Sequence, residues 1–479
     1  MSETVNSKIA TFICDFEADK LSLLTVKNAT SAILDTLAVT VAGRGEVEIK
    51  TLEASLPVYP KTDPTHATAI DTAVRLSSWR ADDAALLLGT ASHVLDYDDV
   101  SMVTVCHPSA PIVSAMCATI CFGDASIKPN GSAFVAAFCL GTEVMIRVGQ
   151  AMGFRHYELG FHPTATLGNI GATAAIARLT GLGRAPTAHA LSIAASMSGG
   201  LRSNFGSMVK PLHVGLAAAN AMRAVQLASA GVTGAADIFE SSGFLHAFSG
   251  GATDTWPTGI LLGQPFVLEA PGFEQKRYPC CYILHKIIEA TLALRREHSL
   301  VLDDIASALV RLPHGGTRPL NHPYPRTGLN GKFSAPYAVI ASVVDGRINL
   351  SSFLDASVLR PDIQRRLTDI RVIEEGPTSN EGSDLSNGPV TVSLSLKNGR
   401  TVSHTITLAP GSPADPITAE QLEKKWVDCF KIGRPCMSEA VARDMYSVGS
   451  GLNEMPDVTH WLGAICQDSS TLQHGEKKA

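Results

Sequence analysis

The chain has 479 residues, of which 45% are hydrophobic and 18% charged, and its formal net charge is −6 at pH 7. This length predicts a large core and more than one domain, and the mildly acidic balance argues against a nucleic-acid partner, which would need a basic surface. The ten cysteines lack C-x-x-C spacing, which favours reduced core thiols over a disulfide framework.

The N-terminal residues 1–8 contain no apolar targeting core. We therefore expect an intracellular, cytoplasmic protein, and a mitochondrial location stays open. The most apolar runs, 110–122 and 133–140, are shorter than the roughly 20 residues that a membrane-spanning helix needs. No membrane partner is predicted.

The first half of the chain has the periodicity of helices rather than strands. Residues 1–60 predict two helices and a turn; one helix covers 23–42, and Gly43 would cap it. Residues 66–69 predict a short strand or an extended entry to the next turn. Further helices are predicted at 83–95, 109–122, 132–150, 163–180, 187–199 and 212–230.

The second half mixes helices and strands after a loop-rich stretch at 235–272. The sequence Asn398-Gly399 between two alternating runs predicts a hairpin. Residues 375–389 are polar and glycine-rich, which predicts a surface loop. Helices are predicted at 282–298, 332–344 and 420–429, and strands at 306–313, 370–374, 390–396 and 401–408.

These elements predict a mainly α fold with two domains. A large all-α helical domain should comprise residues 1–272 together with 409–470, because the last helical stretch is expected to pack back on the first. A smaller α/β (α+β) lid domain should comprise residues 273–408. Residues 471–479 are polar and predict a flexible tail.

Crowded acids mark the strongest candidate site. Asp96-Tyr97-Asp98-Asp99 ends one apolar run, and His107-Pro108-Ser109 opens the next. Burying several acids beside a histidine between two helices costs free energy, so this pattern is more typical of a functional site. The alternative is a helix end, a turn and a helix cap with water-facing acids, in which Asp98 and Asp99 cap a helix or pair with arginines.

Three later stretches place a histidine or lysine just before a proline. They are His162-Pro163, Lys210-Pro211 and Lys276-Arg277-Tyr278-Pro279. Proline is tolerated at a helix start, and helix N-termini favour anions. These three stretches and His107-Pro108 therefore predict one pocket for a substrate with several carboxylates.

Together the motifs resemble the MmgE/PrpD family, which includes 2-methylcitrate dehydratase, cis-aconitate decarboxylase and iminodisuccinate epimerase. The resemblance runs from the first helix to about residue 430 and implies a homodimer formed through the helical domain. It rests on D-Y-D-D at 96–99, H-P-S at 107–109, H-P-T-A-T-L-G at 162–168, K-P-L-H-V-G at 210–215 and K-R-Y-P at 276–279.

The resemblance implies catalytic roles for five of these residues. Histidines can transfer protons near neutral pH, lysines can hold carboxylates, and the aspartate could orient a histidine or act as base. Each histidine could instead be a core residue, and each lysine a surface residue. The five are Asp96, His107, His162, Lys210 and Lys276; Tyr157, His213 and Arg277 are second candidates for substrate binding, and His285 and Lys286 could support the pocket.

The implied chemistry is proton transfer at a carbon beside a carboxylate, which requires no metal and no organic cofactor. The sequence has no Rossmann fingerprint, P-loop or zinc spacing. Adjacent Cys280 and Cys281 are poorly placed to ligate one iron–sulfur cluster.

Two departures from the family pattern bear on the reaction. Val100 replaces a threonine that follows the acidic motif in several members, and Arg318-Pro319-Leu320-Asn321 lacks the tyrosine expected of a decarboxylase. We therefore expect dehydration of a 2-methylcitrate- or alkylcitrate-type acid. The alternatives are decarboxylation of a cis-aconitate-type acid, epimerisation of a substituted succinate, and an inactive family member that serves as a dimer subunit.

Overall fold

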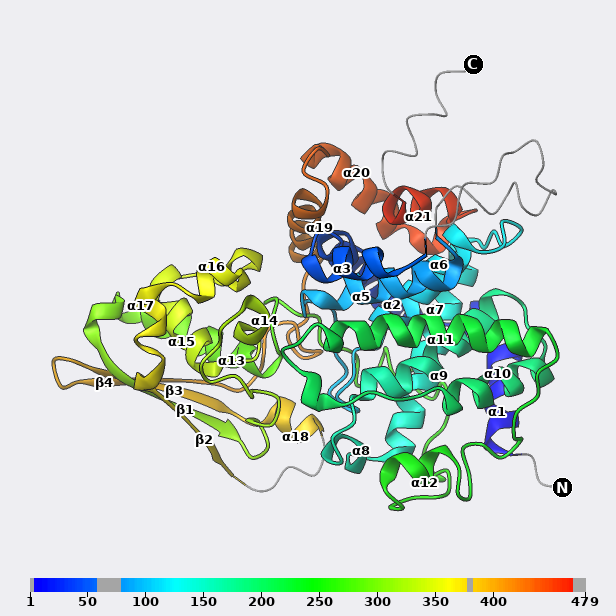
Figure 1. The fold of residues 1–479 in the computed structure, drawn as a ribbon, viewed down its shortest axis with the longest axis horizontal. Helices are drawn as coiled ribbons and strands as arrows, with labels where there is room; N and C mark the ends of the chain where they lie inside the picture. The colour runs from blue at the N-terminus through cyan, green and yellow to red at the C-terminus, as the bar shows by residue number, and fades with distance from the viewer. Residues whose placement is uncertain (1–3, 58–78, 377–381, 468–479) are drawn as a thin grey trace.

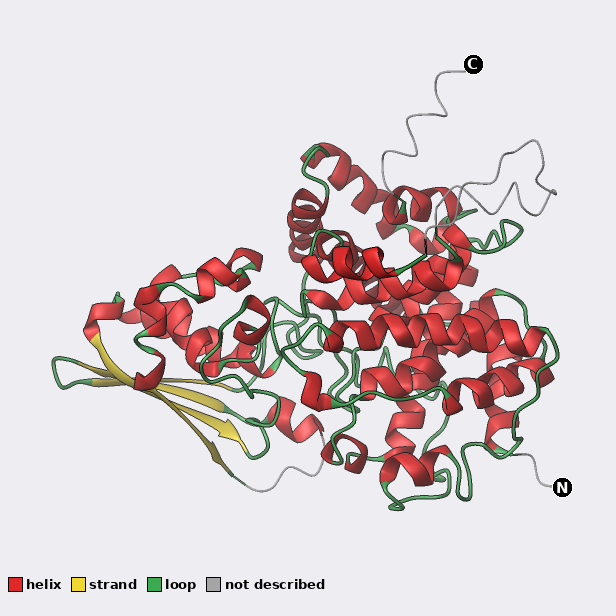
Figure 2. Ribbon diagram, in the orientation of Figure 1, coloured by secondary structure: helices red, strands yellow, loops and turns green. Residues whose placement is uncertain are grey.

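The computed structural model describes residues 4–57, 79–376 and 382–467, and over these ranges the protein is mainly helical (Figures 1 and 2). A four-stranded sheet lies at one end of the molecule and the larger helical body at the other. The segment predicted at 66–69 and the tail predicted at 471–479 lie outside the described ranges.

The helical body is built from two separate parts of the chain, because helices from the C-terminal end pack beside N-terminal ones. In particular α19 lies against α2 (Figure 1). Its helices are α1 (Val5–Asp15), α2 (Leu23–Gly43), α3 (Val47–Ser55), α5 (Ala81–Val94), α6 (Ser109–Phe122), α7 (Gly131–Met152), α8 (Arg155–Glu158), α9 (Pro163–Leu179), α10 (Arg184–Ser196), α11 (Val209–Ser229), α12 (Phe244–Ser249), α19 (Ala419–Gly433), α20 (Glu439–Ser450) and α21 (Thr459–Cys466).

Glycine lets the central helices approach closely. A Cβ atom on Gly43 would lie 2.0 Å from the carbonyl oxygen of Ala91, and one on Gly89 would lie 2.7 Å from the Cα atom of Gly215. The prediction that Gly43 caps its helix is wrong, because α2 includes Gly43 and Arg44 is the C-cap. Gly43 is required for contact with α5 rather than for chain reversal.

Helix α7 departs from the prediction that no apolar run is long enough to span a membrane. It has 22 residues and is apolar enough by composition, but 89% of its most apolar window is buried inside the structure. Burial of this kind is typical of a core helix.

The second body is a mixed sheet with helices on one face (Figure 2). Its strand order is β2-β1-β3-β4; β1 pairs with β2 in parallel, and the other pairs are antiparallel. Its elements are α13 (Ile283–His298), β1 (Ile305–Pro313), α14 (Gly328–Gly331), α15 (Ala335–Asp345), α16 (Asp355–Val358), α17 (Pro361–Gln364), β2 (Ile370–Glu375), α18 (Gly382–Asn387), β3 (Val390–Leu396) and β4 (Thr401–Ile406). A separate apolar core lies between sheet and helices.

Part of the stretch predicted as a surface loop is the short helix α18. Leu385 in this helix is buried. The ammonium of Lys286 donates hydrogen bonds to the carbonyls of Ser386 and Gly388, which fixes the end of α18 to α13. Tertiary contacts therefore order a segment whose polar composition is typical of a loop. The boundaries predicted for the two domains remain a prediction.

Candidate active site

The site begins at the turn after α5, where three acids are buried rather than solvated. Asp96, Asp98 and Asp99 are each at most 3% exposed, so the interpretation with water-facing acids is wrong. Asp96 has a left-handed backbone with φ of 51°, a conformation that non-glycine residues adopt at some energetic cost.

Asp99 accepts hydrogen bonds from the first residue of α6. The backbone N–H of Ser109 donates to its carboxylate at 3.3 Å, and the Ser109 hydroxyl donates to the other oxygen. Burial raises the pKa of Asp99 well above its usual value. The N-cap residue of α6 is Pro108, which has no side-chain cap hydrogen bond, so Asp99 accepts from the helix start without occupying the cap position.

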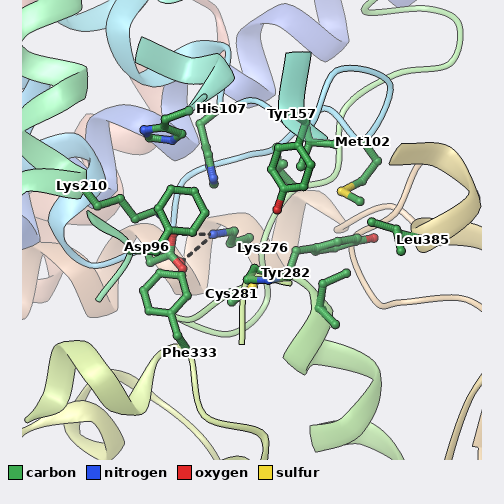
Figure 3. Close-up of a pocket in the computed structure, with 16 residues that line it drawn as sticks. Asp96, Met102, His107, Tyr157, Lys210, Lys276, Cys281, Tyr282, Phe333 and Leu385 are labelled. Carbon is green, nitrogen blue, oxygen red and sulfur yellow. Dashed lines mark hydrogen bonds and ion pairs between the residues drawn. The ribbon is translucent and has the colours of Figure 1, made fainter. Parts of the chain in front are cut away.

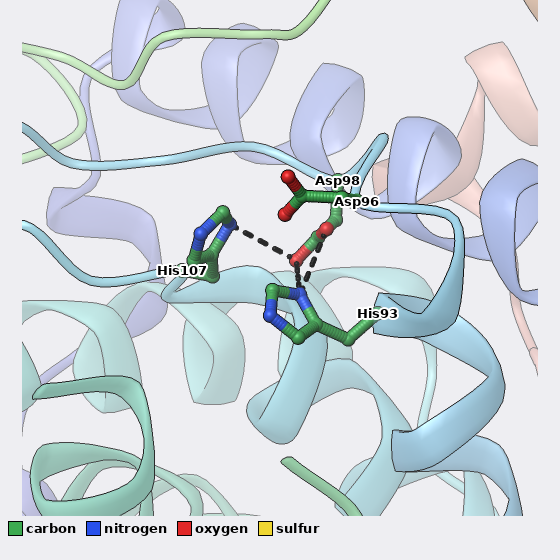
Figure 4. A group of neighbouring side chains, drawn as sticks. All are labelled: His93, Asp96, Asp98 and His107. Atoms are coloured by element: carbon green, nitrogen blue, oxygen red, sulfur yellow. Dashed lines mark hydrogen bonds and ion pairs between the residues drawn. The ribbon is translucent and has the colours of Figure 1, made fainter. Parts of the chain in front are cut away.

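Asp98 pairs with two histidines (Figure 4), and among the residues that the structure describes it forms no ion pair with an arginine. Its Oδ2 atom lies 2.8 Å from Nδ1 of His93 and 3.3 Å from Nδ1 of His107. Burial alone would raise the pKa of Asp98, but the two imidazoles hold it well below its usual value. Burial lowers the pKa of His93 to about 3. Asp98 is thus the acid that contacts imidazoles, whereas orienting a histidine was one of the two roles predicted for Asp96.

Asp96 instead holds two lysines (Figure 3). Its Oδ1 atom lies 2.6 Å from Nζ of Lys210 and 3.0 Å from Nζ of Lys276. Lys210 Nζ is also 2.9 Å from Nε2 of His93. Burial opposes ionisation of Asp96, yet the two ammonium groups hold its pKa well below the usual value. Its Oδ2 atom is buried without a hydrogen-bond partner among the described residues.

His107 and His162 are buried imidazoles with different partners. Nδ1 of His107 lies 2.7 Å from the carbonyl oxygen of Asp99, which can only accept, so this nitrogen carries the proton. In the neutral ring Nε2 then bears the lone pair. Nδ1 of His162 lies 3.1 Å from Nδ1 of His213, and within the described chain its Nε2 atom has no hydrogen-bond partner. Burial lowers the pKa of both His107 and His162.

All five residues predicted to be catalytic line one pocket (Figure 3). The space between these side chains, counted together with the open solvent at its mouth, is about 520 Å³. Tyr157, a predicted binding residue, lines it too. The complete lining is Asp96, Val100, Met102, Val105, His107, Tyr157, His162, Phe205, Lys210, Lys276, Cys281, Tyr282, Ile283, Pro319, Phe333 and Leu385.

One side of this pocket is apolar and distinct from its charged end. Part of it belongs to a small hydrophobic cluster that is separate from the two main cores. We call this surface the apolar wall; it consists of Val100, Met102, Tyr282, Ile283 and Leu385.

The structure does not bring every predicted residue to the pocket. Arg277 is half-exposed, pairs with Glu289 at 3.7 Å and lines a different groove. His213 contacts His162 but does not line the pocket. His285 is buried beside the carbonyl of Tyr278, so it packs behind the site.

The expected helix starts are only partly present. Pro163 is the first residue of α9 and Pro211 lies in the first turn of α11, whereas α6 begins one residue after Pro108. Pro279 begins no helix, because α13 starts at Ile283. Lys276 reaches the pocket from an irregular segment.

The sequence analysis did not identify several residues of the site. His93 lies only three residues before Asp96, within the apolar run, and that spacing could have identified it. Buried Lys332 and Lys425 also surround the site, but neither lies in a motif or has a local signal.

His93, Asp96, Asp98 and His107 place possible metal-ligand atoms within 4.8 Å of one another (Figure 4). The fit to a cation is poor, because the ammonium groups of Lys210 and Lys276 already contact Asp96. A divalent ion would be repelled by both at short range.

Comparisons with known proteins agree with the motifs. A model of the MmgE/PrpD N-terminal domain matches residues 7–256, and one of the C-terminal domain matches residues 278–444. Cis-aconitate decarboxylase of Mus musculus is 27% identical over 89% of this chain and 86% of its own length. The Homo sapiens enzyme of that name is 27% identical over 72% of this chain and 71% of its own. The cis-aconitate decarboxylase-like protein oryM of Aspergillus oryzae is 26% identical over 72% and 74%, respectively.

Proposed function

The chain belongs to the MmgE/PrpD family, and we propose that it is a cofactor-independent lyase acting on a small polycarboxylic acid. The observation that carries this proposal is the convergence of two lysine ammonium groups and two buried imidazoles on one pocket. Relatives named cis-aconitate decarboxylase support a lyase acting on a tricarboxylic acid.

The proposed roles follow from the contacts of each side chain. Lys210 and Lys276 hold the substrate carboxylates and stabilise the charge that builds during proton removal. Nε2 of His107 takes the proton from carbon, because its Nδ1–H is held by a carbonyl. His162 enters this step as an imidazolium, which the negative charge of the bound polycarboxylate favours, and it gives its proton to the leaving hydroxyl, which departs as water. In this scheme Asp96 keeps the two ammonium groups in place.

Dehydration of a 2-methylcitrate- or longer alkylcitrate-type acid is the reaction that we favour. The apolar wall supports it, because a carboxylate would be poorly solvated there and an alkyl substituent would be well accommodated. Val100 lies in this wall where several family members have a hydroxyl.

The second candidate is decarboxylation of a cis-aconitate-type acid, and the names of the relatives favour it. A decarboxylase of this family is expected to have a tyrosine in the stretch 318–321, and this chain has none there. Pro319 of that stretch lines the pocket. This difference weakens the candidate but leaves the site residues unchanged.

Proton NMR in D₂O, without added metal, tests these alternatives on 2-methylcitrate, an alkylcitrate, citrate and cis-aconitate. A vinyl signal from a citrate-type acid without carbon dioxide release would support dehydration. Carbon dioxide from cis-aconitate would favour decarboxylation instead. Deuterium uptake into a substituted succinate, added as a fifth substrate, without elimination would indicate epimerisation. If none of the five reacts, the proposed lyase function is wrong for these acids.

A further inference from the structure

Three successive backbone carbonyls at the site each accept a hydrogen bond from a different buried lysine. We call residues 95–97 the acidic turn. The Nζ atom of Lys332 donates to the carbonyl of Leu95 at 2.7 Å, that of Lys276 to Asp96 at 2.9 Å, and that of Lys425 to Tyr97 at 2.7 Å.

The same lysines tie the acidic turn to the segment that carries Lys276. Lys332 also donates to the carbonyl of Pro279 at 3.0 Å, and Lys425 also donates to the carbonyl of Lys276 at 2.9 Å. Each of these two ammonium groups therefore joins a carbonyl of the acidic turn to a carbonyl of residues 276–279.

Lys332 and Lys425 reach the turn from opposite parts of the molecule. Lys332 immediately follows α14 in the sheet-containing body, whereas Lys425 lies on α19 of the helical body. Lys425 also pairs with buried Asp35 at 2.6 Å and lies 3.7 Å above the Tyr97 ring. The acidic turn is therefore held from both bodies.

Burying these ammonium groups is costly, which indicates that they are retained for a purpose. Both lysines are 5% exposed. Lys332 has no carboxylate partner among the described residues, and burial lowers its pKa to about 8. Their shared target is the turn in which Asp96 has a left-handed backbone.

We propose that Lys332 and Lys425 are positioning residues that hold the acidic turn so that the Asp96 carboxylate meets Lys210 and Lys276. Neither lysine lines the pocket, so each acts through the backbone. The kinetic part of this inference rests on the proposed function, whereas its structural part does not.

The first test is Lys332→Met, which removes the ammonium group and keeps the length of the side chain. We expect kcat to fall by about 10²-fold, because a displacement near 1 Å of a reacting group has that effect. We expect KM to change less than kcat, because no side chain that contacts the substrate is itself removed. A crystal structure should show a longer distance between Asp96 Oδ1 and Lys276 Nζ than the present 3.0 Å.

The second test is the double variant Asp35→Asn with Lys425→Met. Removing Lys425 alone would leave the buried Asp35 charge unpaired and could unfold the protein, so both charges are removed. The same fall in kcat and the same displacement of Asp96 are expected.

Arg178→Met provides a matched control. The Arg178 guanidinium also joins backbone carbonyls, those of Ile13 at 3.4 Å, Cys14 at 2.7 Å and Phe16 at 2.8 Å. It lies at the end of α9 remote from His162. This variant should lower the melting temperature and leave kcat within about threefold of the wild-type value.

Wild-type kcat in Lys332→Met and in the double variant would overturn the inference, as would crystal structures in which Asp96 keeps its φ and both lysine contacts. An equal fall of kcat in Arg178→Met would also overturn it, because the effect would then be general destabilisation. If the wild-type protein converts none of the tested acids, the proposed function fails, and the crystal structures alone decide this inference.

Discussion

At the scale of single residues, the site separates fixed charges from neutral proton carriers. Asp96 stays ionised between Lys210 and Lys276, whereas burial disfavours protonation of His107 and His162. A neutral imidazole can accept a proton at neutral pH, and adjacent ammonium groups favour carboxylate binding. The two tasks therefore fall on different side chains.

His162→Ala should fold normally and lose activity. Loss of a group that transfers a proton typically lowers kcat by about 10²–10⁴-fold, and the deletion leaves only a small cavity beside His213. Circular dichroism and thermal unfolding would establish folding, and the NMR assay would measure the rate. An unfolded variant would mean that His162 is a structural core residue.

Glu274 should make stability dependent on pH. Burial raises its pKa to about 8, while its carboxylate accepts from the Met102 N–H at 3.1 Å. The folded state therefore retains a proton that the unfolded state releases above a pKa of roughly 4.3, so stability falls as pH rises from there to about 8.

Glu274→Gln should remove this dependence and raise the free energy of unfolding at pH 8 by a few kcal/mol, since each unit of pKa shift corresponds to about 1.4 kcal/mol. Urea unfolding of the wild-type and variant proteins at pH 5, 6.5 and 8 measures the free energy of unfolding at each pH. Parallel pH profiles of the two proteins would contradict the prediction.

At the scale of elements, the helices were predictable because their apolar residues recur at 3.6-residue spacing. The prediction for α6 matches at both ends, and those for α7, α9, α10 and α11 differ by a few residues. The strands were predictable from alternation and from the Asn398-Gly399 turn, and β3 has the expected alternating burial. Short helices such as α18 were missed because contacts, rather than local pattern, order them.

The crossing of α5 and α11 should depend on Gly89. An alanine there would place Cβ 2.7 Å from Gly215 Cα, so the helix backbones would have to separate. We expect Gly89→Ala to lower the free energy of unfolding by about 1–3 kcal/mol, as overpacked cores do. Gly45→Ala is the control, because its nearest atom would be 4.0 Å away. Chemical denaturation would compare them, and equal stability would contradict the packing argument.

Helix α18 should influence substrate choice through Leu385. Leu385→Ala shortens the apolar wall, so KM for an alkylcitrate should rise by about tenfold, the order expected for lost apolar contact. KM for citrate, which has no alkyl group to place there, should change much less. Steady-state kinetics with both acids tests this prediction. Equal changes in KM for the two acids would mean that the apolar wall does not contribute to substrate recognition.

At the scale of the whole molecule, the site lies where separate parts of the chain meet. The helical body provides Asp96, His107, His162 and Lys210, while Phe333 and Leu385 come from the sheet-containing body. Buried Lys332 connects the sheet-containing body to the acidic turn, and buried Lys425 connects the helical body to it. The stability of this turn and the geometry of the site should therefore be coupled.

The resemblance to the family predicts a homodimer through the helical body. Leu216 and Leu227 on α11 are each 42% exposed and provide apolar surface there. Light scattering should give twice the chain mass of 50.5 kDa, and changing both leucines to glutamate should shift the protein towards monomer. A monomeric wild-type mass would contradict the expectation.

By itself the sequence determined the helical and strand periodicity, the family motifs and six of the pocket residues, because each depends on local spacing or on residue type. Only the tertiary structure decided which charges meet. Asp98 rather than Asp96 faces the imidazoles, Arg277 points away from the pocket, and Lys425 reaches a turn more than 300 positions earlier in the chain. The physical reason is that burial and pairing of charge depend on groups distant in sequence, on which local pattern carries no information.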